Sequence, residues 1–233
     1  MRKRKPLIIA HRGAKSLAKH ENTLESFQIA IDMKLNMVEF DIRQTKDKQL
    51  VIYHNPTIAH KKISDLTYRQ LTIIAQKKRL EIPLLETVLQ LCQGKIRLDV
   101  EIKEPGYEKE VVSLVTRYFG YDEFIMISFY DSVIKKVKLL DPKIRTGLLI
   151  GLENATLRQR IQEIYPVQRL KNTNADFVAA HYYLVTRFLL YLCKKHHYDL
   201  VVWTVNRDKV FHKLRKQRVT AIVTDYPQNY VNS

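Results

Sequence analysis

The chain has 233 residues, a formal net charge of +16 and a pI near 9.7. It contains no run of about 18 apolar residues, and residues 7–10 are too short for a signal-peptide core, so we expect a cytoplasmic protein without a membrane span. The basic balance favours an anionic partner, which would be nucleic acid, an anionic membrane surface or a phosphorylated small molecule.

Short apolar runs alternate with amphipathic segments from the N-terminus onward. Residues 7–10 are wholly apolar, as in a strand buried on both faces. Asn22 and Glu25 have the spacing of a capping box, so we expect a helix to begin at Asn22. Residues 37–42 form the next apolar strand pattern.

Two carboxylates interrupt this second strand. Glu39 and Asp41 are at i and i+2, so they project from one face about 6.6 Å apart. Neighbouring acids on the inner face of a buried strand repel each other and are costly to desolvate. A divalent cation removes that cost, and an oxygen-only set suits Mg²⁺ or Ca²⁺. The alternative is a solvent-facing acid pair on an edge strand.

The chain then leaves the regular alternation. Residues 45–49 predict a polar turn, and residues 50–54 a returning strand that brings His54 beside the acids. Residues 55–83 are more polar and less regular, with a helical pattern after Thr67. We expect a short cap excursion over one end of the fold.

The remaining chain repeats a strand–helix unit without any Pro/Gly/Ser-rich linker. With the two earlier runs this gives eight strands, which predicts a parallel α/β sheet closed into a (β/α)₈ barrel over a single domain, residues 1–233. An open doubly wound sheet is the alternative. The later strands are expected at residues 96–102, 124–129, 145–150, 177–180, 200–205 and 221–223.

The two cysteines lie in apolar helical patterns. Neither Cys92 nor Cys193 has metal-ligand spacing, so we expect buried free thiols in a reducing compartment. A disulfide between them is the alternative.

Polar residues gather at the ends of the predicted strands. In barrels of this kind the carboxyl ends of the strands form one rim, and active sites lie there. Several strands presenting acids, bases and cations at one rim therefore predict a site. The residues are His11, Glu39, Asp41, His54, Glu101, Lys103, His181, Asn206 and Asp225.

These residues belong to a series of short motifs that extends over almost the whole chain. The motifs are His11-Arg12-Gly13; Glu21-Asn22-Thr23 with Phe27; Glu39-x-Asp41; Thr45-Lys46-Asp47 before His54; Ile82-Pro83 with Leu85-Glu86; Glu101-Ile102-Lys103; Ser128-Phe129; Trp203-Thr204-Val205-Asn206; and Thr224-Asp225-Tyr226-Pro227. Their order and spacing resemble those of the glycerophosphodiester phosphodiesterase family. The resemblance implies a TIM-type barrel with a small β-hairpin and a short cap after the second strand.

The resemblance also implies one divalent cation, Mg²⁺ or Ca²⁺, held by Glu39, Asp41 and Glu101. His11 and His54 would be the acid–base pair. An unperturbed imidazole pKa of about 6.5 suits either role near neutral pH. The resemblance further implies that the substrate's glycerol hydroxyl attacks first and that water then opens a cyclic phosphate. The residues expected around the phosphate are Arg12 and Lys103, and Trp203 either walls the glycerol pocket or belongs to the core.

Several positions depart from the family pattern. His20 stands where Pro usually precedes Glu-Asn-Thr, Lys48 stands where Gly usually follows Lys-Asp, and Asn55 replaces an acid after the second histidine. The segment 55–83 is short and lacks the Arg-Thr-Thr-Asn-Gly-like stretch that many members carry in the cap. These changes bear on substrate selection more than on catalysis.

We therefore expect a metal-dependent hydrolase that converts glycerophosphodiesters to glycerol 3-phosphate and an alcohol. A close alternative is a lysophospholipase D-like enzyme acting at membranes, which the short cap and the basic surface favour. An alternative of another class is a non-catalytic barrel that binds anionic surfaces or nucleic acid; against it, the chain has no recognised nucleic-acid motif. Peripheral contact with an anionic membrane is compatible with both enzyme hypotheses.

Overall fold

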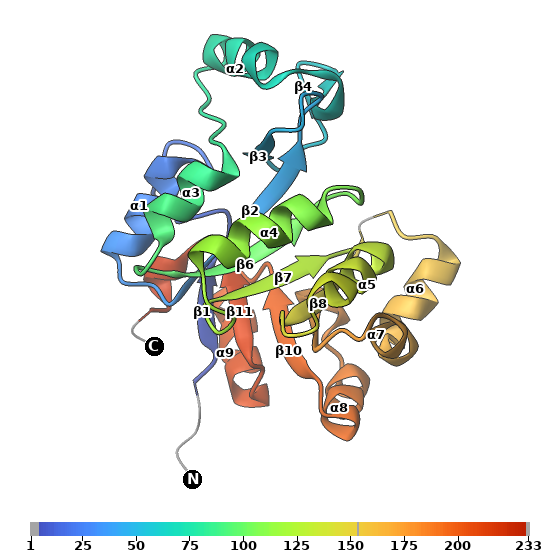
Figure 1. The fold of residues 1–233 in the computed structure, drawn as a ribbon. Coiled ribbons are helices and arrows are strands. Elements are labelled where there is room, and N and C mark those ends of the chain that lie inside the picture. Colours follow the sequence, from blue (N-terminus) through green and yellow to red (C-terminus); the bar gives the residue numbers. More distant parts are fainter. Residues whose placement is uncertain (1–4, 153, 232–233) are drawn as a thin grey trace.

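A closed barrel of parallel strands forms the centre of the molecule (Figure 1). The computed structural model describes residues 5–152 and 154–231. The ring closes because β1 (Leu7–Ala10) pairs in parallel with both β2 (Met37–Gln44) and β11 (Ala221–Thr224). The predicted barrel is therefore confirmed, and the open sheet is wrong. The other ring strands in order are β6 (Arg97–Ile102), β7 (Phe124–Ser128), β8 (Thr146–Ile150), β9 (Phe177–His181) and β10 (Asp199–Trp203).

Helices connect successive strands and cover the outside of the ring (Figure 1). Their buried apolar side chains pack against the outward faces of the strands in two large clusters. The helices are α1 (Leu24–Asp32), α3 (Leu85–Cys92), α4 (Glu108–Tyr118), α5 (Asp131–Leu140), α6 (Leu157–Ile164), α7 (Val167–Thr173), α8 (Arg187–His196) and α9 (Asp208–Gln217).

Strand alternation separates the apolar core from the polar rim. In β2, Val38, Phe40 and Ile42 are fully buried among the outer helices. Glu39 and Asp41 lie between them in sequence, so they project to the opposite face, into the barrel. The barrel interior below the acids is filled by a third apolar cluster that includes Ile9, Ile127, Leu149, Phe177 and Val201.

The chain leaves the ring after β2. β3 (Leu50–Ile52) pairs antiparallel with β2 outside the barrel. The segment 55–83 has its own small apolar cluster and extends from the barrel at the end of β2 (Figure 1). The helix predicted after Thr67 is present, and Thr67 is its N-cap. The elements of this segment are β4 (Thr57–Ile58), β5 (Lys61–Lys62), a 3₁₀ turn (Ile63–Asp65) and α2 (Tyr68–Lys77).

Two local predictions need correction. The N-cap of α1 is Thr23, not Asn22, because Thr23 and Ser26 exchange the capping-box hydrogen bonds. Asn22 has a left-handed backbone with φ of 58° and turns its side chain toward Asp41. The returning strand ends at Ile52 rather than His54, since the His54 carbonyl accepts hydrogen bonds from Arg43 instead of a strand partner.

Both cysteines are free and buried, as expected. Burial raises the pKa of Cys92 to about 12 and that of Cys193 to about 11, so both thiols stay protonated and unreactive near neutral pH. Within residues 5–152 and 154–231, every helix is too short or too polar to cross a bilayer.

We predict that Gly147→Ala destabilises the barrel. A Cβ at Gly147 would lie 2.1 Å from Cε2 of Phe177, which is paired with it across β8 and β9 and is buried. Overpacking of this kind costs about 1–3 kcal/mol, so the melting temperature should fall by roughly 2–4 °C per kcal/mol. Thermal denaturation measures the change.

The matched control is Gly120→Ala, whose Cβ would meet only side-chain oxygens at 3.3 Å or more. Adding Phe177→Leu to Gly147→Ala should recover part of the loss. An unchanged melting temperature for Gly147→Ala would contradict the packing argument.

Candidate functional site

Three carboxylates from two neighbouring strands meet at the carboxyl end of the barrel. Parallel pairing of β2 with β6 sets Asp41 opposite Glu101 and Glu39 opposite Asp99. Oxygen atoms of Glu39, Asp41 and Glu101 lie within 4.8 Å of one another, and these side chains are buried. At such a separation two ionised carboxylates repel by roughly 3 kcal/mol at an effective dielectric constant of about 20. The cluster therefore demands positive charge.

The acids differ in how far their charge is compensated. Burial, then the Asp41 and Glu101 charges, raise the pKa of Glu39 well above its ordinary value. Burial likewise raises the pKa of Glu101, although Lys103 opposes the shift. Burial also acts on Asp41, but Lys103 and Arg12 overcome it and hold its pKa well below the usual range. Asp41 is thus the carboxylate that stays ionised.

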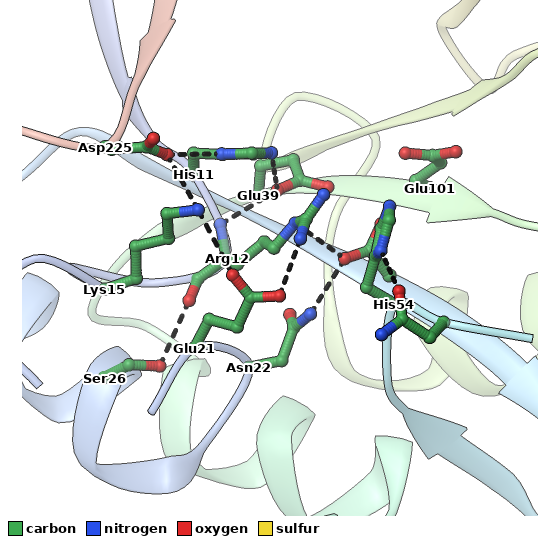
Figure 2. Close-up of polar contacts among 12 residues, drawn as sticks. His11, Arg12, Lys15, Glu21, Asn22, Ser26, Glu39, His54, Glu101 and Asp225 are labelled. Carbon is green, nitrogen blue, oxygen red and sulfur yellow. Dashed lines mark hydrogen bonds and ion pairs between the residues drawn. The ribbon is translucent and has the colours of Figure 1, made fainter. Parts of the chain in front are cut away.

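Two cations contact this cluster. Lys103 Nζ lies 2.8 Å from Glu101 Oε1 and 3.2 Å from Asp41 Oδ1. Arg12 Nε lies 3.3 Å from Asp41 Oδ2, and Arg12 Nη1 donates to Glu21 Oε1 at 2.6 Å (Figure 2). Both cations are therefore fixed beside the acids and directed into one space.

The turn after β1 depends on backbone conformations that place Arg12. Arg12 has φ of 54°, and its backbone N–H donates to Glu39 Oε2 at 2.9 Å. Gly13 follows with φ of 80°, and a Cβ there would lie 2.8 Å or less from three atoms of Ser26, one of them backbone. Only glycine fits this position. The His-Arg-Gly order is thus a steric requirement of the site.

His11 is held between two carboxylates (Figure 2). Its Nδ1 hydrogen-bonds Asp225 Oδ1 at 2.6 Å, and its Nε2 lies 3.9 Å from Glu39 Oε2. Burial lowers the pKa of His11, while the Asp225 hydrogen bond opposes that shift. Burial would raise the pKa of Asp225, but the hydrogen bond and charge of His11, together with Lys15 and Asn206, outweigh it and lower that pKa to about 2. Asp225 therefore fixes the ring and stabilises its protonated form.

His54 reaches the site from the segment after β3. Arg43, on the same face of β2 as Asp41, donates to the His54 carbonyl at 2.6 and 2.8 Å. His54 Nδ1 donates to the amide oxygen of Asn55 at 2.9 Å, which leaves Nε2 with the lone pair. Burial lowers the pKa of His54 to about 4, so the ring is neutral near pH 7.

A narrow cavity of about 60 Å³ lies between the acids of the rim and the apolar interior of the barrel, since Glu39 and Glu101 line it together with Ile127. Trp203 lines it, and its indole N–H donates to Ala179 O at 3.0 Å while its ring packs edge-on against Phe129. Asp99 also lines the cavity, at 1 % exposure, and neither carboxylate oxygen has a hydrogen-bond partner. Burial, together with the charges of Glu101 and Asp41, raises the pKa of Asp99 well above its ordinary value.

A wider cavity of about 520 Å³ opens beside this one. His54, Glu101 and Lys103 line both cavities, so the two share a boundary. The rest of the wide cavity is mainly polar and comes from β2, the turns that follow β7 and β8, and helices α5 to α7. The other lining residues are Arg43, Phe129, Tyr130, Asp131, Leu152, Gln159, Gln162, Glu163 and Arg169.

The structure brings the residues expected at the rim into one neighbourhood. Asp225 and Asn206 contact each other at 2.7 Å behind His11, and His181 packs its ring on Trp203 at 4.9 Å. Sequence reasoning missed Asp99 and Arg43. Strand alternation identifies both of them. Arg43 lies two residues after Asp41, and Asp99 lies two residues before Glu101, so each projects to the same inward face as its neighbouring acid.

The donor set fits a hard divalent cation. Three buried carboxylates whose oxygens lie within 4.8 Å can be spanned by an ion with ligand distances of about 2.4 Å, as for Ca²⁺. Mg²⁺, at about 2.1 Å, would draw them closer. The uncompensated burial of Glu39 indicates that positive charge is needed beyond Lys103 and Arg12.

Comparisons with known proteins agree with this geometry. Residues 11–229 match the model of the glycerophosphoryl diester phosphodiesterase family. YhdW of Bacillus subtilis (strain 168) is 29% identical, with 94% of each chain aligned. The glycerophosphodiester phosphodiesterase of Caldanaerobacter subterraneus subsp. tengcongensis is 27% identical over 98% of this chain and 97% of its own. A phosphodiesterase of Oleispira antarctica, solved with its product sn-glycerol-3-phosphate, has a TM-score of 0.80 at 23% identity, with 98% of each chain covered.

We predict that Asp99→Asn stabilises the metal-free protein. The folded-state pKa of Asp99 is raised above its unfolded value of about 3.9, so the wild type loses stability as the pH rises through and above that value. Asparagine removes this penalty. In EDTA the melting temperature should rise by roughly 3 °C or more at pH 8, and by less at pH 5.

The control is Asp122→Asn, an exposed acid, which should change the melting temperature little at either pH. A lower melting temperature for Asp99→Asn at pH 8 would mean that the Asp99 carboxylate is required in its ionised form.

Proposed function

The chain belongs to the glycerophosphoryl diester phosphodiesterase family, and on that premise we propose that it hydrolyses glycerophosphodiesters to sn-glycerol 3-phosphate and an alcohol. The observation that carries the proposal is a buried cluster of three carboxylates and two cations lying between two histidines. A phosphodiester is anionic, and its oxygens repel a nucleophile. Fixed positive charge beside general acid–base groups meets both difficulties.

We propose that Glu39, Asp41 and Glu101 hold one divalent cation, Mg²⁺ or Ca²⁺. The three carboxylates supply the hard oxygen ligands that both ions prefer. Bound there, the ion would supply charge stabilisation for the phosphoryl oxygens.

Arg12 and Lys103 are proposed to bind the phosphate. The planar guanidinium of Arg12 can contact two phosphate oxygens, whereas the Lys103 ammonium acts as a point charge. Both are already held by carboxylates, at Glu21 and Asp41 for Arg12 and at Glu101 and Asp41 for Lys103. They therefore lose little conformational freedom when the substrate binds.

The histidine environments suggest different roles. His54 is neutral and carries its lone pair on Nε2, which suits a general base that takes the proton of the substrate's glycerol hydroxyl. His11 hydrogen-bonds an ionised carboxylate, which suits a general acid that protonates the departing alkoxide. As the glycerol oxygen bonds to phosphorus, the bond to the alcohol oxygen breaks and a cyclic phosphate forms.

Hydrolysis of the cyclic phosphate would use the same groups in exchanged roles. His11, now neutral, takes a proton from water, and His54 returns its proton to the glycerol oxygen as the ring opens. The product is glycerol 3-phosphate, and both histidines regain their starting state. The Trp203 face would pack beside the glycerol, and the wide polar cavity would receive the alcohol.

We predict metal-dependent turnover of glycerophosphocholine that EDTA abolishes. Asp41→Asn should lower the affinity for Mg²⁺ or Ca²⁺ by at least about 10-fold, because it removes a charged ligand. Activity should fall at low metal and recover in part at high metal. Calorimetric metal titration and steady-state assays measure the two effects, and circular dichroism checks the fold.

Asp122→Asn is the control with the same charge change at an exposed site. Full activity of Asp41→Asn at low metal would show that the ligand set is wrong. Assays with a lysophospholipid in parallel separate the lysophospholipase D-like alternative. Absence of EDTA-sensitive turnover with either substrate would favour a non-catalytic barrel.

We predict that His11→Ala is rescued by a better leaving group. On glycerophosphocholine the variant should lose about 10²–10⁴-fold in kcat, the usual contribution of a general acid. On the p-nitrophenyl ester of glycerol 3-phosphate the loss in release of p-nitrophenolate should be far smaller, since that leaving group needs no proton.

His54→Ala is the matched comparison, because removal of the base should impair both substrates equally. Equal losses for His11→Ala on the two substrates would contradict the assignment, and a selective rescue of His54→Ala would reverse it.

A further inference from the structure

Helix α6 exposes its apolar side to solvent. Leu157, Ile161 and Ile164 follow i, i+4, i+7 spacing and are 80%, 59% and 50% exposed. Within the helix the buried residue is a charged one, Glu163. An amphipathic helix on a globular protein normally turns its apolar side to the core. The reversed orientation indicates that this side is covered by something else.

Polar anchoring fixes the orientation of α6. Glu163 Oε1 accepts hydrogen bonds from the backbone N–H groups of Gly151 and Leu152 at 2.7 and 2.8 Å. Arg160 donates to Glu163 Oε2 at 2.7 Å and also to Leu152 O at 2.8 Å. Rotating the helix to bury its leucine and isoleucines would break this buried network, so the exposed stripe is built into the fold.

Aromatic residues extend the stripe onto a second helix. Tyr165, directly after α6, stacks on Phe188 of α8 with ring centroids 6.4 Å apart. Tyr191 lies one helical turn beyond Phe188, and the three rings are about half exposed. We name this surface the α6–α8 face. It consists of Leu157, Ile161, Ile164, Tyr165, Phe188 and Tyr191.

The surroundings of this face are basic. Residues 154–198 contain seven lysines and arginines against two acids. Arg160 is paired with Glu163 at 2.7 Å, Arg169 with Asp131 at 2.6 Å, and Asp176 with Lys138 at 2.6 Å. Five of the seven cations lie outside these pairs. The exposed cations on α6 and α8 are Arg158, Arg187, Lys194 and Lys195.

We propose that the α6–α8 face docks on the surface of a bilayer that contains anionic lipids. Aliphatic and aromatic side chains can enter the boundary between head groups and acyl chains, while the surrounding lysines and arginines attract the lipid phosphates. A second copy of the chain fits less well, because a symmetric contact would oppose two basic rims. Nucleic acid fits less well because exposed leucine and isoleucine offer no stacking surface.

Docking in this way would bring the wide cavity close to the membrane. Gln159, Gln162 and Glu163 of α6 line that cavity, and the apolar residues of the same helix form the docking face. The bound lipid surface and the site would therefore be separated by one helix. Binding to vesicles does not depend on the proposed catalysis, so the two can fail separately.

The test measures sedimentation of the full chain with vesicles in EDTA, without substrate. Binding is expected to vesicles of phosphatidylglycerol and phosphatidylcholine and to be at least about 10-fold weaker to phosphatidylcholine alone. The double variant Leu157→Ser, Ile164→Ser should weaken binding by about 10-fold or more, since it removes apolar area that insertion would take out of water. Lys194→Gln, Lys195→Gln should weaken it and flatten its salt dependence.

Matched controls carry the same substitutions elsewhere. Leu139 and Ile73 are 80% and 48% exposed, close to the values for Leu157 and Ile164, and lie on α5 and α2. Leu139→Ser, Ile73→Ser and the pair Lys77→Gln, Lys78→Gln should change binding by less than about 2-fold. All variants should turn over glycerophosphocholine like the wild type.

Equal binding to both kinds of vesicle, or equal losses in the test and control variants, would overturn the proposal. The proposal would also be overturned if the wild type did not bind vesicles but formed a dimer in sedimentation velocity, and if Leu157→Ser, Ile164→Ser dissociated that dimer. That second result would assign the face to another copy of the chain.

Discussion

Four carboxylates buried on two paired strands are the constraint on which the rest of the site depends. The parallel register of β2 and β6 sets Glu39 beside Asp99 and Asp41 beside Glu101, at depths where water cannot disperse their charge. Lys103, which directly follows β6, compensates two of them. The pairing of β2 with β6 in the barrel is thus the interaction that creates a need for cations at its rim.

The loops around the rim place cations and hydrogen-bond donors beside these carboxylates. The left-handed turn at Arg12 and Gly13 aims both a guanidinium and a backbone N–H at the acids. Arg43 binds the carbonyl of His54 and so holds a histidine from outside the ring against the rim. These groups are fixed by bonds to backbone and carboxylate, which places them before any substrate arrives.

The sequence predicted the ring and the rim because both follow from periodicity. Apolar runs at regular spacing identify the strands, and the acids at Glu39, Asp41 and Glu101 interrupt them at one end. Asp99 has the pattern of an ordinary polar position in an alternating strand, because alternation does not say which face of the strand is shielded from water. The reversal of α6 was equally hidden, since Leu157, Ile161 and Ile164 have the spacing expected of a helix packed on a core.

Asn55 stands where the family pattern has an acid, and this difference changes the charge that faces Nδ1 of His54. A carboxylate against His54 Nδ1 would stabilise the imidazolium, whereas the amide oxygen fixes the same tautomer without adding charge. Burial lowers the pKa of His54, and the amide opposes that shift less than a carboxylate would, so His54 stays neutral beside Asp41 while His11 keeps an ionised partner in Asp225. One amide and one carboxylate thus give two chemically identical side chains different electrostatic surroundings, and the proposed base and acid roles use that difference.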